Sequence, residues 1–346
     1  MDIRHMYKQH IKKRIIFGLF LFLILIVSAI YSLCVGDYQL TISQVLSAIF
    51  GHEAGTVNLI IWNIRLPRII TAIIAGSSLA VAGAVMQCIL RNPLASPFTI
   101  GISHGAMFGA SLAIILFGFG EMKSGTVFFN NPYMITMFAF FGALIGVVVI
   151  LSLAKLRGLT PEAMILAGVA MSSLFTAGTM LIQYFANDLQ LASMVYWTFG
   201  DLGRAGWEEI WILLVVALSS IVYFIYKRWD YNALEAGEET AKSLGVNTER
   251  VRLIGMLIAS LLTAVNVAFL GIIGFVGLIC PHIVRIFIGG DYRFLIPISA
   301  LFGAVLLLIA DTFARTIISP LILPVGILTS FLGAPMFLYL LIRMYR

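Results

Sequence analysis

The stretch YMITMFAFFGALIGVVVILSLAK, Tyr133–Lys155, carries no charged residue before its final lysine. A helix needs about 20 apolar residues to cross a hydrocarbon core about 30 Å thick, so this stretch predicts a transmembrane helix. Several other apolar runs exceed about 18 residues. Over the whole chain 61% of residues are hydrophobic and 11% are charged, against roughly half and a quarter in soluble domains. We therefore expect an all-α, polytopic membrane protein with one domain, residues 1–346.

The apolar runs exclude a transmembrane β-barrel, whose strands would alternate apolar and polar residues over segments of about ten. Cysteine usage excludes two further classes. Cys34, Cys88 and Cys280 lie in or beside apolar runs and lack the spacing of metal ligands. We expect neither a disulfide framework nor a metal site.

Ten transmembrane spans are predicted on the 20-residue criterion. They cover residues 15–35, 64–90, 98–118, 133–155, 161–185, 208–226, 251–271, 273–289, 294–317 and 324–343. The eighth is short and glycine-rich, so we expect other helices to surround it. A basic segment followed by Ile15–Tyr31 is also typical of a signal peptide, but the bulky Leu33 before Cys34 argues against cleavage. We interpret this segment as the first membrane helix.

Positive charge predicts the orientation of the chain. An even number of spans places both termini on one side, and with that side in the cytoplasm 17 of the 22 Lys and Arg residues lie inside. The five outside cations are Arg65, Arg68, Lys123, Arg204 and Arg315. The net charge of +6 is thus a topology signal and does not imply nucleic-acid binding.

The long polar interruption is Lys227–Arg252, which holds ten charged residues in 26 positions and is predicted to be cytoplasmic. Within it we predict one short helix that starts at Asn232 and ends at Gly245. Small or apolar residues share one face of this helix: Leu234, Gly237, Ala241 and Leu244. Such a face is typical of a helix that docks into a groove of a soluble partner. The alternative is a solvated loop on the membrane surface.

No catalytic constellation is found in the sequence, and a nucleotide site is also missing. A phosphate-binding loop needs Gly-Lys-Ser/Thr, whereas the most similar stretch of this sequence is Met122-Lys123-Ser124, with methionine in place of the glycine. If ATP drives this protein, the ATPase is therefore a separate chain.

Polar residues inside the predicted spans are few: Gln87, Gln183, Asn266 and Asp311. Asp311 and Arg315 are four residues apart, which predicts an ion pair on one helix. His104 and His282 are isolated, and we interpret both as structural. The absence of a ladder of buried acids or histidines disfavours a transporter driven by protons or sodium.

The stretch Glu239–Gly245, ETAKSLG, resembles the E-A-A-x-x-x-G coupling loop of bacterial ABC importer permeases, with Thr240 in place of the alanine at the middle of E-A-A. The longer run Glu235–Val246 is similar to the version in the FecCD family of permeases for iron-siderophore, haem and cobalamin uptake, including the cobalamin importer permease. Further stretches that resemble this family are RLPR at 65–68, GAVMQ at 83–87, RNPLASP at 91–97, GFVGLICPHIVR at 274–285, PVGILT at 324–329 and GAP at 333–335.

The resemblance implies a type II ABC importer fold with ten helices, paired with a second permease chain of the same or a sister sequence. It also implies that the 227–252 loop inserts into an ATPase subunit that binds ATP and Mg, while this chain holds no cofactor. The implied coupling residues are Glu238, Glu239, Ala241, Leu244 and Gly245. No residue is assigned to catalysis or to a metal.

In that family, arginines on the outer face dock acidic residues of a periplasmic or lipid-anchored substrate-binding protein. Arg65 and Arg68 match the R-L-P-R stretch, and Arg315 matches the arginine that closes the ninth helix. Without the motif, anchoring at the membrane interface would explain Arg65 and Arg68 as well as docking does. Tyr196 and Trp197 match a short outer helix that lies beside the translocation path in that family. The two side chains are therefore interpreted either as part of a gate or as part of an interfacial aromatic belt.

The expected function is thus the permease of a binding-protein-dependent, ATP-driven importer in a bacterial or archaeal plasma membrane. A ferric siderophore is the expected cargo, with haem and cobalamin as alternatives. An ion-coupled secondary transporter and a non-transport membrane scaffold are the alternatives from other classes.

Overall fold

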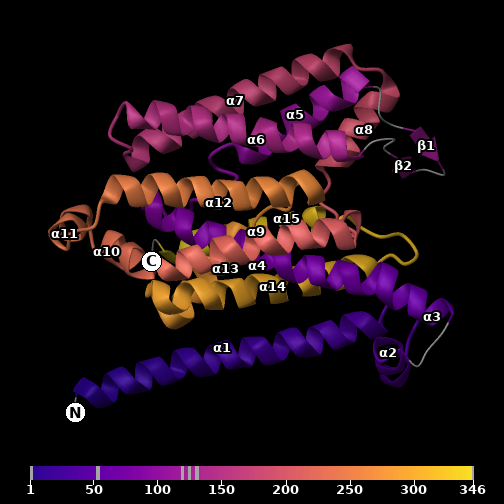
Figure 1. Ribbon diagram of the computed structural model, residues 1–346, viewed down its shortest axis with the longest axis horizontal. Helices are drawn as coiled ribbons and strands as arrows, with labels where there is room; N and C mark the ends of the chain where they lie inside the picture. Colours follow the sequence, from indigo (N-terminus) through magenta and orange to yellow (C-terminus); the bar gives the residue numbers. More distant parts are fainter. Residues whose placement is uncertain (1–2, 52–54, 118–120, 124–125, 129–131, 345–346) are drawn as a thin grey trace.

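Most of the chain folds into helices, and most of the long ones run along one axis (Figure 1). The computed structural model describes residues 3–51, 55–117, 121–123, 126–128 and 132–344. Within them, seven helices are long and apolar enough to cross a membrane. These are α1 (Ile3–Cys34), α4 (Leu66–Ile89), α6 (Pro132–Lys155), α7 (Pro161–Phe185), α9 (Trp207–Tyr226), α12 (Thr248–Leu270) and α14 (Tyr292–Thr316). Helix α4 continues directly from α3 and η1.

Three further apolar helices complete the set of predicted spans: α5 (Ile102–Phe117), α13 (Val276–Ile288) and α15 (Val325–Met344), whose apolar stretch is Val325–Tyr339. The third span was predicted to start at residue 98, and the structure corrects this start to Ile102. The preceding segment contains two prolines and ends at Gly101, whose φ of +83° is unfavourable for other residues. The brevity predicted for the eighth span is confirmed by the 13 residues of α13.

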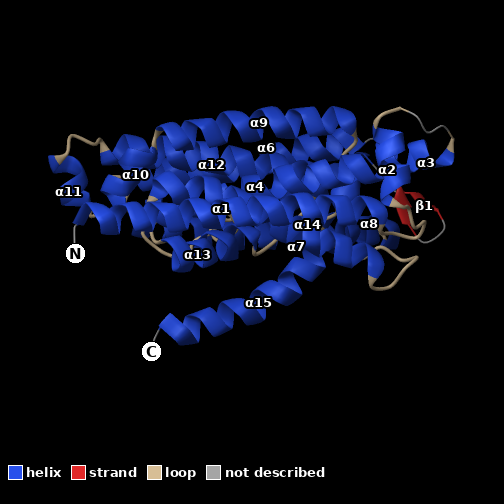
Figure 2. Cartoon of the chain, turned by 90° about the horizontal axis from the view of Figure 1, so that it is seen from below, coloured by secondary structure: helices blue, strands red, loops and turns tan. Residues whose placement is uncertain are grey.

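Short elements lie at the two ends of the bundle (Figures 1 and 2). The end that we call the α11 end carries α10 (Arg228–Glu235) and α11 (Glu238–Ser243). The opposite end, here the α8 end, carries the following elements: α2 (Ile42–Ile49), α3 (Thr56–Leu59), the π-helical η1 (Ile60–Arg65), α8 (Asp188–Thr198), η2 (Leu202–Arg204), and the antiparallel strands β1 (Glu121–Lys123) and β2 (Thr126–Phe128). Both chain termini lie toward the α11 end (Figure 1), as an even number of spans requires.

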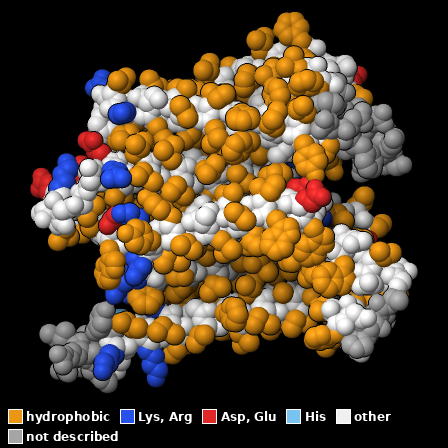
Figure 3. All heavy atoms as spheres, in the orientation of Figure 1, with side chains coloured by type: hydrophobic (Ala, Val, Ile, Leu, Met, Phe, Trp, Pro, Cys, Tyr) orange, Lys and Arg blue, Asp and Glu red, His pale blue; other side chains and the backbone are white. Residues whose placement is uncertain are grey.

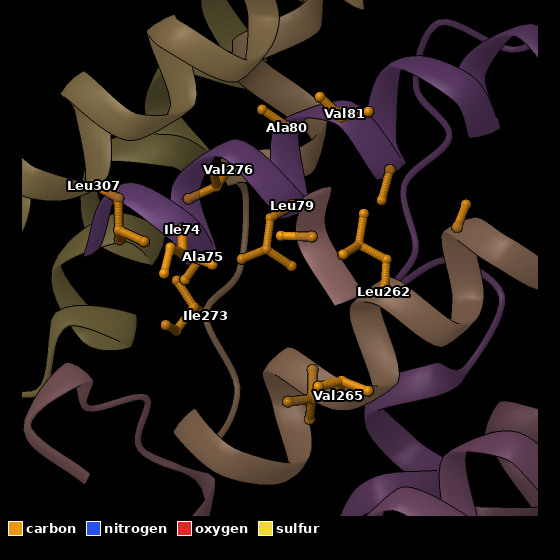
Figure 4. Close-up of a cluster of buried hydrophobic side chains, with 14 of the residues drawn as sticks. Ile74, Ala75, Leu79, Ala80, Val81, Leu262, Val265, Ile273, Val276 and Leu307 are labelled. Carbon is orange, nitrogen blue, oxygen red and sulfur yellow. The ribbon is translucent and has the colours of Figure 1, made fainter. Parts of the chain in front are cut away.

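Helix α4 forms the centre of the bundle and packs against α12, α13 and α14. Figure 4 shows its Ile74 and Leu79 among side chains of these neighbours. Glycines bring the backbones together: a Cβ atom on Gly83 would lie 1.6 Å from the carbonyl oxygen of Gly277 in α13. Another on Gly76 would lie 2.2 Å from the carbonyl oxygen of Gly303 in α14. Small residues thus permit the close packing of α4 on α13 and α14.

The segment that leads into α13 is not helical, although it lies inside the protein. Its backbone bends at Gly271 and at Phe275, which adopt positive φ values of 78° and 65°. Ile272 forms a parallel bridge with Phe199, and the nearby Gly326 amide donates to the Gly200 carbonyl. Irregular backbone at membrane depth is tolerated when protein groups satisfy it in this way.

Apolar side chains cover the middle of the molecule, and Lys and Arg gather toward the α11 end (Figure 3). Helix α15 leaves the body of the bundle at an angle (Figure 2). Large apolar side chains such as Phe331 on α15 and Tyr184 on α7 are exposed. A continuous apolar belt between polar ends is the surface that a bilayer requires.

Candidate functional site

The polar interruption of the sequence forms two helices at the α11 end, where one was predicted. Gly237 separates α10 from α11 with a φ of +128°, a conformation that other residues rarely adopt. Asn232 therefore does not cap a helix start. It lies inside α10, where its side chain donates to Asp291 and accepts from the Tyr292 amide. Gly245, with a φ of +81°, follows the end of α11 as predicted.

The predicted apolar face is also divided between the inside and the outside of the protein. Leu234 and Ala241 are buried in the chain's own core at 1% and 0% exposure. Leu244 is 68% exposed, and Glu239 and Gly245 are exposed beside it. Of the predicted coupling residues, Glu239, Leu244 and Gly245 are therefore open to a partner, while Ala241 attaches α11 to the bundle.

Glu238 joins α11 to the N-terminal part of α12. Its carboxylate accepts a hydrogen bond of 2.8 Å from Arg252, which is buried, and pairs with Lys242 at 3.0 Å. The hydrogen bond from Arg252, followed by that from Lys242, lowers the pKa of Glu238 to about 2. Glu238 thus stays ionised over the whole physiological range and holds α11 against a transmembrane helix.

A second carboxylate at this end connects three further helices. Asp291, which precedes α14, accepts hydrogen bonds from Arg14 of α1, from Asn232 of α10 and from Arg293. Burial raises the pKa of this carboxyl, but hydrogen bonds from Arg293 and Asn232 outweigh burial and lower it to about 2. Both helices of the polar interruption are therefore attached to the membrane bundle by ionised carboxylates.

A different charge cluster lies at the α8 end. The fully buried Asp311 of α14 accepts hydrogen bonds of 2.9 and 3.0 Å from Arg68 Nε of α4. Arg68 also pairs with Asp201 at 3.0 Å, and Arg315 pairs with Asp311 at 3.2 Å, which confirms the predicted pair. Arg315 further donates to the Ser32 hydroxyl of α1 at 2.6 Å. Together, these four charged side chains link α1, α4, α14 and the segment before η2.

The three arginines predicted to dock a binding protein are buried in this structure. Arg65, Arg68 and Arg315 are 4%, 6% and 8% exposed. Arg65 donates to the carbonyl oxygens of Leu33 and Tyr38. The structure thus does not bring the three guanidinium groups onto a common surface patch, because each already bonds within the chain. Their docking role stays a prediction.

Tyr196 and Trp197 lie on α8 and line a pocket of about 420 Å³ with Tyr133 and Glu209. Trp197 is buried at 4% exposure, so of the two Tyr196 is the one more open to solvent. Arg204 fixes the C-terminal end of α8 by donating to the carbonyl oxygens of Tyr196, Trp197 and Phe199 at 2.8 to 3.0 Å. The gate role of the two aromatics stays a prediction.

Sequence reasoning missed the partners of the charged residues. Arg252 and Asp201 were not assigned roles, and Arg204 was recognised only as an outside cation. Their partners lie on other elements, and no local spacing reveals such pairs. Among the described residues no group of three or more His, Cys, Asp or Glu is arranged to hold a metal ion.

The model of the FecCD transport family matches residues 24–343. The chain belongs to the FecCD transport family. This FecCD-family chain is 79% identical to a protein named as an ABC transporter permease, MJ0087 of Methanocaldococcus jannaschii, over 100% of the chain and 99% of the relative. It is 35% identical to the hemin transport permease HmuU of Yersinia pestis, over 96% of the chain and 97% of HmuU. Other relatives are named for import of Fe(3+)-citrate, iron(3+)-hydroxamate and cobalamin.

A solved structure described as an inward-facing conformation of a metal-chelate type ABC transporter has the same fold. Its TM-score is 0.81 at 31% identity, and the match covers 95% of the FecCD-family chain and 99% of the solved one. The FecCD-family chain is therefore a multi-pass ABC importer permease. As a permease subunit it is not itself an enzyme.

Proposed function

We propose that this chain is the permease of an importer driven by a separate ATPase, which contacts the exposed side of α11. The observation that carries the proposal is the construction of this helix. Glu238 and Ala241 attach α11 to the bundle, whereas Glu239, Leu244 and Gly245 are exposed. A partner that moves α11 as a rigid body would thereby move α12, a coupling mode known from domain rotations.

In the proposed orientation, the α11 end lies in the cytoplasm of a bacterial or archaeal cell. The predicted excess of Lys and Arg on that side supports this orientation. ATP and Mg would bind to the ATPase, and this chain would hold no cofactor. A second permease chain would cover the exposed apolar faces of helices such as α7 and α15. A substrate-binding protein would deliver cargo at the α8 end.

A ferric siderophore is the proposed cargo. Relatives named for Fe(3+)-citrate, iron(3+)-hydroxamate and hemin support an iron-bearing chelate. Cobalamin is the second candidate, and it is favoured by a relative 42% identical over 83% of this chain.

Two measurements test the proposal. The tagged chain, purified from native membranes in mild detergent, is expected to retain a stoichiometric ATPase that hydrolyses ATP. Retention of no ATPase would contradict the coupling proposal.

Uptake assays with labelled ferric siderophores, hemin and cobalamin test the cargo independently. We expect a ferric siderophore to be taken up in an ATP-dependent manner. Uptake of cobalamin alone would reject the iron assignment and leave the coupling proposal intact.

A further inference from the structure

A polar pocket of about 460 Å³ lies at the α11 end, between the loop after α4, the α10–α11 junction and α13. Its lining consists of Gln87, Arg91, Asn92, Pro93, Glu235, Gly237 and Arg285. Five of these seven residues carry a polar side chain. The coupling proposal assigns no ligand to this pocket.

Two buried side-chain atoms of the pocket residues lack hydrogen-bond partners. Gln87 is 3% exposed; its Nε2 donates to the Leu278 carbonyl at 3.1 Å, while its buried Oε1 accepts no hydrogen bond. Arg285 pairs with Glu235 and donates to the Tyr292 hydroxyl, which leaves its buried Nε without a partner. Native proteins satisfy nearly all buried polar groups, so an unpaired acceptor and an unpaired donor in the lining of one pocket favour a bound species.

Arg91 supplies a further cationic group at the mouth of the pocket. It is exposed, and its guanidinium makes a long contact of 3.5 Å with the Leu234 carbonyl. Its backbone adopts a φ of +48°, a strained conformation for a residue with a side chain. Such strain is often found at binding sites. With Arg91 and Arg285 against Glu235, the lining carries one net positive charge.

We propose that this pocket binds an oxyanion that carries its own hydroxyl group, with hydrogen phosphate as the simplest case. Arg91 and Arg285 Nε would donate to the charged oxygens, as guanidinium groups do in phosphate sites. The P–OH group would donate to Gln87 Oε1. A hydroxycarboxylate offers the same pair of functions. Sulfate does not, because it has no proton at neutral pH. The volume leaves room for ordered water beside the ion.

Binding of labelled inorganic phosphate to the full chain in lipid nanodiscs tests the proposal at constant pH and ionic strength. We expect saturable binding, competed by unlabelled phosphate at least about tenfold better than by sulfate, since one charge-assisted hydrogen bond corresponds to roughly that factor. Competition by citrate compared with phosphate then identifies which hydroxyl-bearing oxyanion is preferred. Arg91→Gln is expected to weaken binding at least about tenfold. Arg157→Gln, which changes another exposed arginine outside the pocket, is the matched control and is expected to bind as the wild type does.

Gln87→Met tests the acceptor, and it should lower the affinity for phosphate to that for sulfate. Arg91 is exposed, so its variant reports on the site even if Gln87→Met fails to fold. Absence of saturable binding, equal competition by sulfate in the wild type, or equal losses in the Arg91 and Arg157 variants would each overturn the proposal. Phosphate binding is independent of transport, so its outcome is separate from that of the proposed function.

Discussion

The two ends of the bundle use the same ion pair, arginine with a carboxylate, in different surroundings. At the α8 end, Arg68 and Arg315 enclose Asp311, which has no exposed surface. At the α11 end, the buried Arg252 meets Glu238, whose side chain is 32% exposed. The first cluster links transmembrane helices to one another, and the second attaches a peripheral helix to one of them.

This difference determines how much stability is lost when one member of each ion pair is removed. Losing one member of a buried pair leaves an uncompensated charge without water, which is strongly destabilising. A carboxylate near the surface can be rehydrated, so losing its partner costs less. The comparison suggests that the α8 end is built for rigidity and the α11 end for transmission of motion.

The largest expected effect is that of Asp311→Ala. This change leaves Arg68 and Arg315 buried without their common partner and should lower the free energy of unfolding by about 3–5 kcal/mol. Equilibrium unfolding in detergent micelles measures the loss. Asp188→Ala, which removes an exposed carboxylate from the start of α8, is the control and is expected to change stability by less than about 0.5 kcal/mol. Equal stability of the two variants would show that the buried Asp311 cluster does not stabilise the α8 end.

A smaller effect is expected for Arg252→Gln at the other end. Glu238 keeps Lys242 and gains water, so the free energy of unfolding should fall by about 1–2 kcal/mol. Hydrogen exchange should increase in α11 and in the first turn of α12. A loss as large as that of Asp311→Ala would show that the two ends are energetically alike.

The smallest effect concerns the titration of Glu238. Its pKa of about 2 in the folded protein lies below the usual value near 4.3. Its stabilising contribution is therefore present above about pH 4.3 and is lost as the pH falls toward 2. Carbon-13 NMR of the labelled side chain should give this low midpoint in the wild type and a higher one in Arg252→Gln. An unchanged midpoint in the variant would show that Arg252 does not cause the shift.

The sequence predicted the helical class and the ten spans because apolar length is a local property. It also predicted the Asp311–Arg315 pair, whose members lie one turn apart on one helix. The start of α5 was wrong by four residues because the segment before it has an apolar composition but a non-helical backbone. Composition does not distinguish a buried loop from a helix.

Contacts between distant elements were beyond prediction. Arg68 and Asp311 are separated by 243 positions, and only the packing of α4 on α14 brings them together. The predicted face of Leu234, Ala241 and Leu244 was wrong because the bend at Gly237 gives α10 and α11 different orientations. Burial of Leu234 and Ala241 follows from tertiary packing and has no signature in helical spacing.

The proposal that α11 transmits the action of an ATPase is tested most directly by Leu244→Asp. A charge on this exposed leucine should leave the fold intact and reduce the amount of ATPase that co-purifies with the chain at least about tenfold, as expected for a central interface residue. Leu156→Asp, at an 81% exposed leucine in the turn after α6, is the matched control and should retain the wild-type amount of ATPase. If both variants retain the ATPase equally well, α11 is not the coupling element.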